Sequence, residues 1–218
     1  MKRFFSFALA LALLCLSLSF VGCAPIDTTG LLEAAPELIA RSALLNEIFF
    51  GEGIPYDEAG EAQGVFYPAD EAYLSEHGIK TVSDLAAMTK AVFSEAYAAL
   101  ILGSGVSGFP VDGGAYVYPR YASSQPENLR DENETILVSS TSEFLLNPVG
   151  RSSYDYSTLK ISAAERQYAV LSLSVTTVSL LPHDERVEGA DNTVTETLVM
   201  EIKFVRENGA WRIDSPTY

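Results

Sequence analysis

The pattern of apolar and polar positions changes its period along the chain. Beyond residue 35, apolar side chains recur every three or four positions, which is the spacing of a helix with one buried face. From about residue 103 onward they alternate with polar side chains, which is typical of a strand with one buried face. The pattern therefore predicts helices first and an antiparallel sheet last.

The first half contains predicted helices with recognisable ends. Thr81 and Asp84 have the spacing of a capping box, in which two side chains satisfy the free N–H groups at a helix start. Asp70 is suited to begin a short helix, Gly51 to end the first one, and Ser94 to mark a break in the last. The predicted helical segments are residues 35–53, 68–78 and 80–103.

The C-terminal hairpin can be placed in register from its turn. Asn208-Gly209 is the preferred dipeptide for a two-residue turn, because both positions need positive φ. This turn pairs Glu207 with Ala210, and it further pairs Arg206 with Trp211, Phe204 with Ile213, and Lys203 with Asp214. A shift by one residue would put an apolar side chain among the charges. Trp211 is therefore a predicted core residue in the strand that closes the sheet.

The apolar face of this sheet needs a cover, and the N-terminal helices are the segments available for it. The predicted fold class is α+β, with N-terminal helices packed on a curved antiparallel β-meander of at least four strands. Alternation predicts that Leu198, Met200, Ile202 and Phe204 share the buried face. Residues 31–218 are expected to form a single domain that is helical to about residue 103.

The first residues have the pattern of a secretory signal. Lys2 and Arg3 precede an apolar run, and Phe20-Val21-Gly22-Cys23 resembles the lipobox of bacterial lipoproteins, with Phe where Leu is usual. The resemblance implies cleavage after residue 22, a diacylglyceryl group on Cys23, and residues 23–30 as a tether. The alternative is an uncleaved membrane anchor. Either interpretation places the domain on the outer face of a bacterial cytoplasmic membrane.

Charge narrows the class of partner. The chain has 14 basic and 29 acidic residues, and removal of residues 1–22 leaves 12 basic residues and a formal charge of −17. Such a chain is not expected to bind nucleic acid, which needs a cationic surface. The charge favours a cationic protein or cell-wall partner, or serves solubility alone.

The end of the chain suggests a family. Gly209, Trp211 and Ile213 match the Gly-x-Trp-x-Ile/Leu ending of secreted lipoproteins with a cystatin-like cone, the fold of nuclear transport factor and ketosteroid isomerase. The sequence is also similar to small secreted inhibitors of bacterial cell-wall peptidases, in which helices likewise lead into a β-rich half. Both resemblances imply helices packed on a sheet.

Residues suited to catalysis or metal binding are few. His77 and His183 have no second His or Cys at metal-ligand spacing, and the acidic run at residues 131–134 lacks the order of a calcium loop. A ketosteroid-isomerase-like site needs a buried acid beside its tyrosines, and no acid occupies a predicted inward position. We therefore expect no cofactor and no metal, and a cavity lined by apolar and tyrosine side chains.

One cluster of aromatic residues is a candidate recognition patch. Aromatic rings beside an arginine are frequent in binding surfaces, although tyrosine is also an ordinary strand residue. The candidates are Tyr116, Tyr118, Arg120, Tyr121, Tyr154 and Tyr156.

These observations lead to one hypothesis and two alternatives. The hypothesis is a lipid-anchored, extracytoplasmic, non-catalytic domain that binds a ligand or a protein in maintenance of the cell envelope. The first alternative is an inhibitor of a cell-wall hydrolase, and the second is a small-molecule enzyme of the cone family.

Overall fold

The fold is seen in a computed structural model that describes most of the chain after Cys23. The described residues are 24–110, 116–117, 119–125, 134–141, 153–181, 185–190 and 192–217. The signal segment, Cys23, Tyr118 and His183 lie outside them, as do Asp131, Glu132 and Asn133 of the acidic run.

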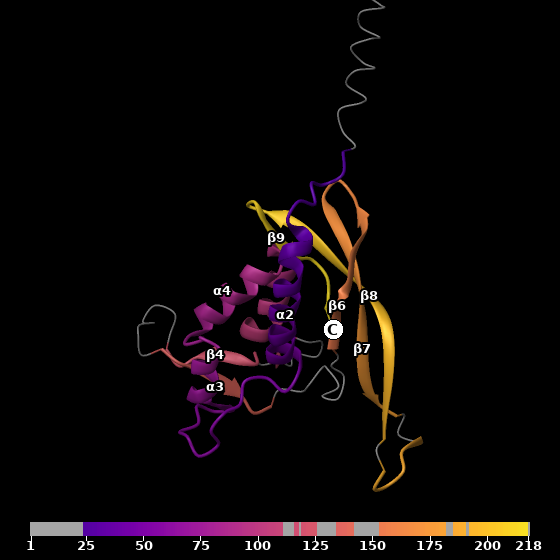
Figure 1. Ribbon diagram of the computed structural model, residues 1–218. Helices are drawn as coiled ribbons and strands as arrows, with labels where there is room; N and C mark the ends of the chain where they lie inside the picture. Colours follow the sequence, from indigo (N-terminus) through magenta and orange to yellow (C-terminus); the bar gives the residue numbers. More distant parts are fainter. Residues whose placement is uncertain are drawn as a thin grey trace, which may run out of the picture.

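Helices come first along the chain and strands follow (Figure 1). The helical elements are α2 (Leu31–Phe50), α3 (Glu71–Glu76), α4 (Val82–Val92), α5 (Glu95–Leu102) and the π-helical turn η1 (Gly103–Ser107). The short strands are β1 (Phe66–Pro68), β2 (Phe109–Pro110), β3 (Tyr116–Val117), β4 (Tyr121–Ser123) and β5 (Ile136–Ser139). The long strands are β6 (Ser153–Ala164), β7 (Tyr168–Leu180) and β8 (Thr193–Glu207), and β9 (Ala210–Ile213) ends the sheet.

The predicted α+β class and four-stranded meander are confirmed. Strands β6, β7, β8 and β9 are neighbours in chain order and antiparallel throughout, and α2 packs against one face of this sheet. A second, three-stranded sheet has the order β1-β5-β4, and its strand β1 sits in a segment rich in Gly, Pro and acids.

The predicted caps at Gly51, Asp70, Thr81 and Ser94 are confirmed, whereas the start of the first helix differs. Thr81 and Asp84 form the capping box of α4, with the Asp84 N–H donating to Thr81 Oγ1 at 3.1 Å. Asp70 caps α3 and Ser94 caps α5, which is the predicted break. The first helix begins at Leu31, four residues before the predicted start. Leu31 and Ala35 are buried, so packing against the core stabilises this first turn ahead of Pro36.

The C-terminal hairpin has the predicted register. Arg206 pairs with Trp211, and Phe204 with Ile213. Asn208 and Gly209 both have positive φ, and the Lys203 ammonium lies 2.7 Å from the Asp214 carboxylate. The Trp211 side chain is buried, as predicted.

After β9 the chain turns back between α2 and β6. Thr217 is fully buried, where its hydroxyl lies 2.8 Å from the Ser42 hydroxyl and accepts from Asn46 Nδ2 at 2.7 Å. The Tyr154 hydroxyl of β6 donates to the Thr217 carbonyl at 3.0 Å. The C-terminal segment therefore fills part of the space between the helices and the sheet.

The segment predicted as a tether is partly packed. The Ile26 N–H donates to the Glu165 carbonyl at 2.6 Å in the β6–β7 turn, and the Ile26 side chain packs against the core. The Thr29 carbonyl accepts from Trp211 Nε1 at 3.3 Å. The chain thus joins the fold several residues before α2 begins.

Candidate functional site: a basic groove beside Trp211

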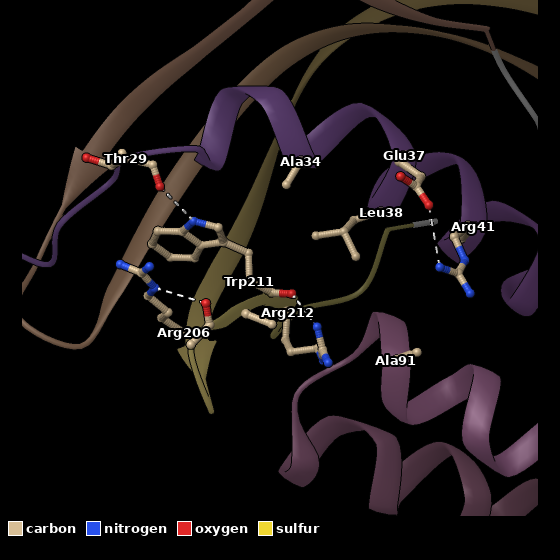
Figure 2. A pocket seen from close by; sticks show the side chains of 11 residues that line it. Thr29, Ala34, Glu37, Leu38, Arg41, Ala91, Arg206, Trp211 and Arg212 are labelled. Atoms are coloured by element: carbon tan, nitrogen blue, oxygen red, sulfur yellow. Dashed lines mark hydrogen bonds and ion pairs between the residues drawn. The ribbon is translucent and has the colours of Figure 1, made fainter.

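A groove of about 420 Å³ opens between α2, the end of α4 and the β8–β9 turn (Figure 2). Its floor is apolar, with Trp211, Leu38, Ala34 and Ala91 contributing carbon atoms. Its remaining lining residues are Thr29, Glu37, Arg41, Arg206, Gly209, Ala210 and Arg212. A chain with a large excess of acids thus places three arginines around one groove.

The three arginines come from different elements. Arg41 lies on α2, one helical turn after Glu37, and the two side chains form an exposed ion pair at 3.5 Å. Arg206 lies near the end of β8 and Arg212 lies on β9, so the tight turn between these strands brings both to the groove. Only the tertiary fold brings Arg41 to them.

Arg206 is held against the tryptophan ring. Its guanidinium carbon lies 5.8 Å from the centre of the Trp211 ring, within the range of a cation–π interaction. The Arg206 Nε donates to the Gly209 carbonyl at 3.3 Å, and Nη1 lies 3.6 Å from the Asp27 carboxylate. Side-chain and backbone hydrogen bonds from Thr29, with a smaller contribution from Arg206, lower the pKa of Asp27 below its ordinary value.

Arg212 is fixed by backbone carbonyls instead of by acids. Its Nε donates to the Lys90 carbonyl in the last turn of α4 at 3.1 Å, and Nη1 donates to the Trp211 carbonyl at 2.9 Å. A guanidinium near the C-terminus of a helix also interacts favourably with the helix dipole. These two bonds fix the position of the Arg212 guanidinium, and because their acceptors are neutral carbonyls they leave its charge in place.

The side chains of the groove are of a type suited to anion binding. Guanidinium groups bind carboxylates and phosphates through paired N–H donors, and weakly paired surface arginines give up their ion pairs at little cost. Glu37 is the one acid among the described lining residues, and it is highly exposed. The expectation of a lining of apolar and tyrosine side chains is wrong for this groove, because arginines replace the tyrosines.

The predicted recognition patch includes two buried residues, which is a correction. Tyr121 is fully buried: its hydroxyl donates to the Ile48 carbonyl and accepts from the Ile54 N–H at 3.1 Å, and burial raises its pKa. Arg120 is buried as well and donates from Nη2 to the Gly51 carbonyl at 2.6 Å, just beyond α2. These side chains hold the end of α2 to the small sheet and offer no surface for a partner.

The other patch residues lie on different sheets. Tyr154 and Tyr156 are stacked on β6 with ring centres 6.1 Å apart, and burial together with the neighbouring ring raises the pKa of Tyr156. Tyr116 lies on β3, which belongs to a separate two-stranded sheet. The candidates that the structure describes therefore lie on or beside separate sheets and do not form one patch.

The groove was missed because its signal is spread over the sequence. The hairpin register already placed Arg206 against Trp211, and Arg212 is the next residue along. A contiguous run of basic residues predicts a basic surface, but these three arginines are separated by up to 171 positions.

His77 packs against a neighbouring aromatic ring. It is the C-cap residue of α3, and its ring centre lies 4.4 Å from the ring centre of Tyr73. Among the residues that the structure describes, no three His, Cys, Asp or Glu side chains are placed to hold a metal ion.

Comparison with protein-family models, with curated proteins and with solved structures gives no match to this chain. No helix within residues 24–217 that the structure describes is long and apolar enough to cross a membrane.

Proposed function

We propose that this protein is a lipid-anchored, extracytoplasmic, non-catalytic binding domain that acts in the cell envelope and binds an anionic ligand in the Trp211 groove. The observation that carries the proposal is the grouping of three arginines over an apolar floor in a strongly acidic chain. Isolated surface arginines would serve solubility equally well at any position, whereas these three line one groove.

The ligand is expected to have two parts. Carboxylates or phosphates meet the guanidinium groups of Arg41, Arg206 and Arg212, and an apolar body lies over Leu38 and Trp211, which are largely buried and form the groove floor. Peptides of the cell wall carry carboxylates and apolar side chains together, so a soluble wall peptide fragment is the ligand class that we favour.

The position of the groove agrees with an anchor at Cys23. The chain between Cys23 and Thr29 spans at most about 20 Å when extended. Thr29 lines the groove, and the described chain enters the fold at this end (Figure 1). Lipidation at Cys23 would therefore hold the groove close to the membrane surface.

Intrinsic fluorescence tests ligand binding directly, because Trp211 is the only tryptophan in the sequence and lines the groove. A soluble wall peptide fragment titrated into the purified protein should change the emission in a saturable way. Replacing two exposed cations, Arg41→Gln with Arg206→Gln, should weaken this binding about tenfold or more.

The matched control removes two cations elsewhere. Lys160 and Arg166 are exposed and do not line the groove, so Lys160→Gln with Arg166→Gln should leave the titration unchanged. Equal weakening by this control pair would show that net charge alone attracts the fragment. A wild-type protein with no saturable response to the fragment would contradict this choice of ligand.

The anchor has its own test. Cys23→Ala should abolish incorporation of radiolabelled fatty acid into the protein, because the modified sulfur is absent. Continued labelling of this variant would contradict lipidation at Cys23 without affecting the argument for the groove.

A further inference from the structure

The outer part of β8 is an open sheet edge. Strand β9 pairs with β8 only between Phe204 and Glu207, and the Asp214 N–H extends this contact to the Lys203 carbonyl. From Thr195 to Glu201, β8 pairs with β7 on one side, and none of the described strands pairs with it on the other. This stretch is the open edge.

Hydrogen bonds at its boundary show which backbone groups point outward. The Lys203 N–H donates to Ser215 Oγ at 3.0 Å, and its carbonyl accepts from Asp214, so both groups of Lys203 face away from β7. Antiparallel pairing alternates this direction at every residue. Because the register between β7 and β8 has no irregularity, the backbone groups of Thr195, Thr197, Val199 and Glu201 also face outward.

The open edge has few of the features that protect natural edge strands from pairing. Such strands are commonly blocked by charged side chains, Lys above all, by Pro or by a bulge, and the only charged side chains of this stretch are Glu196 and Glu201. Residues 193–202 contain neither Lys nor Pro, and their register is regular. Instead, Val199 is 71% exposed and Leu198 is 50% exposed, one on each face of the sheet.

The charge around the open edge is acidic. Glu196 and Glu201 are exposed on the strand itself, and Glu185 and Glu188 are exposed in the connection between β7 and β8. Arg186 is the one described cation in that connection. A partner that pairs with this edge gains from Lys or Arg side chains at the positions that face these acids.

We propose that the open edge of β8 binds an extended, basic segment of another protein by strand addition. Backbone hydrogen bonds to Thr195, Thr197, Val199 and Glu201 supply the pairing, and alternating apolar and basic side chains of the partner meet Leu198, Val199 and the acids. A second copy of this chain is the poorer occupant, since it brings another formal charge of −17 after signal removal.

This surface is separate from the basic groove. The groove lies beside the β8–β9 turn. The β7–β8 connection lies at the opposite end of the sheet, away from the point where the described chain begins (Figure 1). The proposal therefore does not depend on the ligand of the groove.

A synthetic peptide of alternating Val and Lys tests the proposal, with binding to the full mature protein measured by calorimetry. The control peptide has the same sequence with alternate backbone amides methylated, which preserves its charge and prevents strand pairing. We expect saturable binding of the first peptide and at least tenfold weaker binding of the second. Equal binding of both would overturn the proposal.

Two protein variants locate the site. Val199→Pro removes an outward N–H that β7 does not use, and proline is tolerated on sheet edges, so we expect a folded protein with at least tenfold weaker peptide binding. Val199→Thr keeps the N–H and should bind as wild type does. Equal binding by folded Val199→Pro would overturn the proposal.

Charge reversal gives a result even if the proline variant fails to fold. Glu196→Lys with Glu201→Lys should weaken peptide binding several-fold, whereas Glu33→Lys with Glu165→Lys, both exposed and away from the open edge, should not. An equal effect of the two pairs would show attraction by net charge and overturn the proposal. Sedimentation showing a wild-type dimer that Val199→Pro abolishes would assign the edge to a second copy and overturn it too.

Discussion

The two halves of the β7–β8 hairpin have the same sequence pattern and different surroundings. Near β9, Leu171, Ile202 and Phe204 are fully buried. Toward the connection between the strands, Leu198 continues the same face of β8 but is half exposed, which contradicts its predicted burial. The helices lie against one part of the sheet, and β9 lies beside only the last residues of β8, so Leu198 is exposed although its partner Val175 on β7 is buried (Figure 1). Alternation decides which side chains share a face, whereas the length of the covering elements decides whether that face is buried.

The largest expected effect lies at the covered end of the sheet. Trp211→Ala removes a buried aromatic ring that packs under α2, so it should lower the free energy of unfolding by about 3–5 kcal/mol. Urea denaturation followed by circular dichroism measures this, since the variant has no tryptophan. An unchanged midpoint would show that Trp211 serves the groove and not the core.

The sharpest comparison uses two positions on one face of β8. Ile202→Ala should cost about 2–5 kcal/mol because Ile202 is fully buried. Leu198→Ala should change the stability by roughly 0.5 kcal/mol, as exposed positions do. Denaturation of the two variants under the same conditions tests this. Similar losses would mean that both halves of the hairpin belong to one core.

A smaller effect distinguishes two tyrosines that the sequence grouped together. Tyr121→Phe leaves the buried Ile54 N–H without its acceptor and should cost about 1–3 kcal/mol. Tyr156→Phe, at a partly exposed ring on β6, should be nearly neutral. Thermal denaturation of both variants compares them, and a neutral Tyr121→Phe would remove the structural role that we assign to its hydroxyl.

The smallest effect concerns the point where β9 ends and the open edge begins. Burial raises the pKa of Asp214, but hydrogen bonds from Lys203 and Ser94 outweigh it and lower the pKa below the ordinary 3.8. A lowered folded-state pKa stabilises the fold above pH 3.8, and this stabilisation is lost as the pH falls through the lower, folded-state value.

Denaturation of wild type and Asp214→Asn between neutral and acidic pH tests the sign. The variant should be less stable than wild type at neutral pH, and the difference should shrink in acid. A constant difference across the pH range would show that the ionisation of Asp214 does not stabilise the hairpin.

Local patterns in the sequence predicted local structure well. The capping box at Thr81 and Asp84 and the Asn208-Gly209 turn depend on neighbouring residues, and both form as expected. The short strand β1 escaped prediction because its pairing with β5 joins segments about 70 residues apart, and its own sequence has no alternation.

The binding surfaces were less predictable for the same reason. Arg120 and Tyr121 looked like surface residues beside other tyrosines, but the end of α2 covers them. The groove depends on the approach of α2 to β9, which no local pattern specifies. The edge of β8 is open because β9 is much shorter than β8. In the sequence, the only sign of this is that apolar and polar residues stop alternating after Ile213.

Amide hydrogen exchange along β8, measured by NMR on the free protein, tests most directly whether this strand has a covered and an open half. We predict continuous protection from Ile202 to Val205, where backbone groups bond on both sides. From Thr195 to Glu201 protection should alternate, with fast exchange at the outward-facing Thr195, Thr197, Val199 and Glu201. Uniform protection through both halves would contradict the account, because it would mean that the outer edge of β8 is already paired.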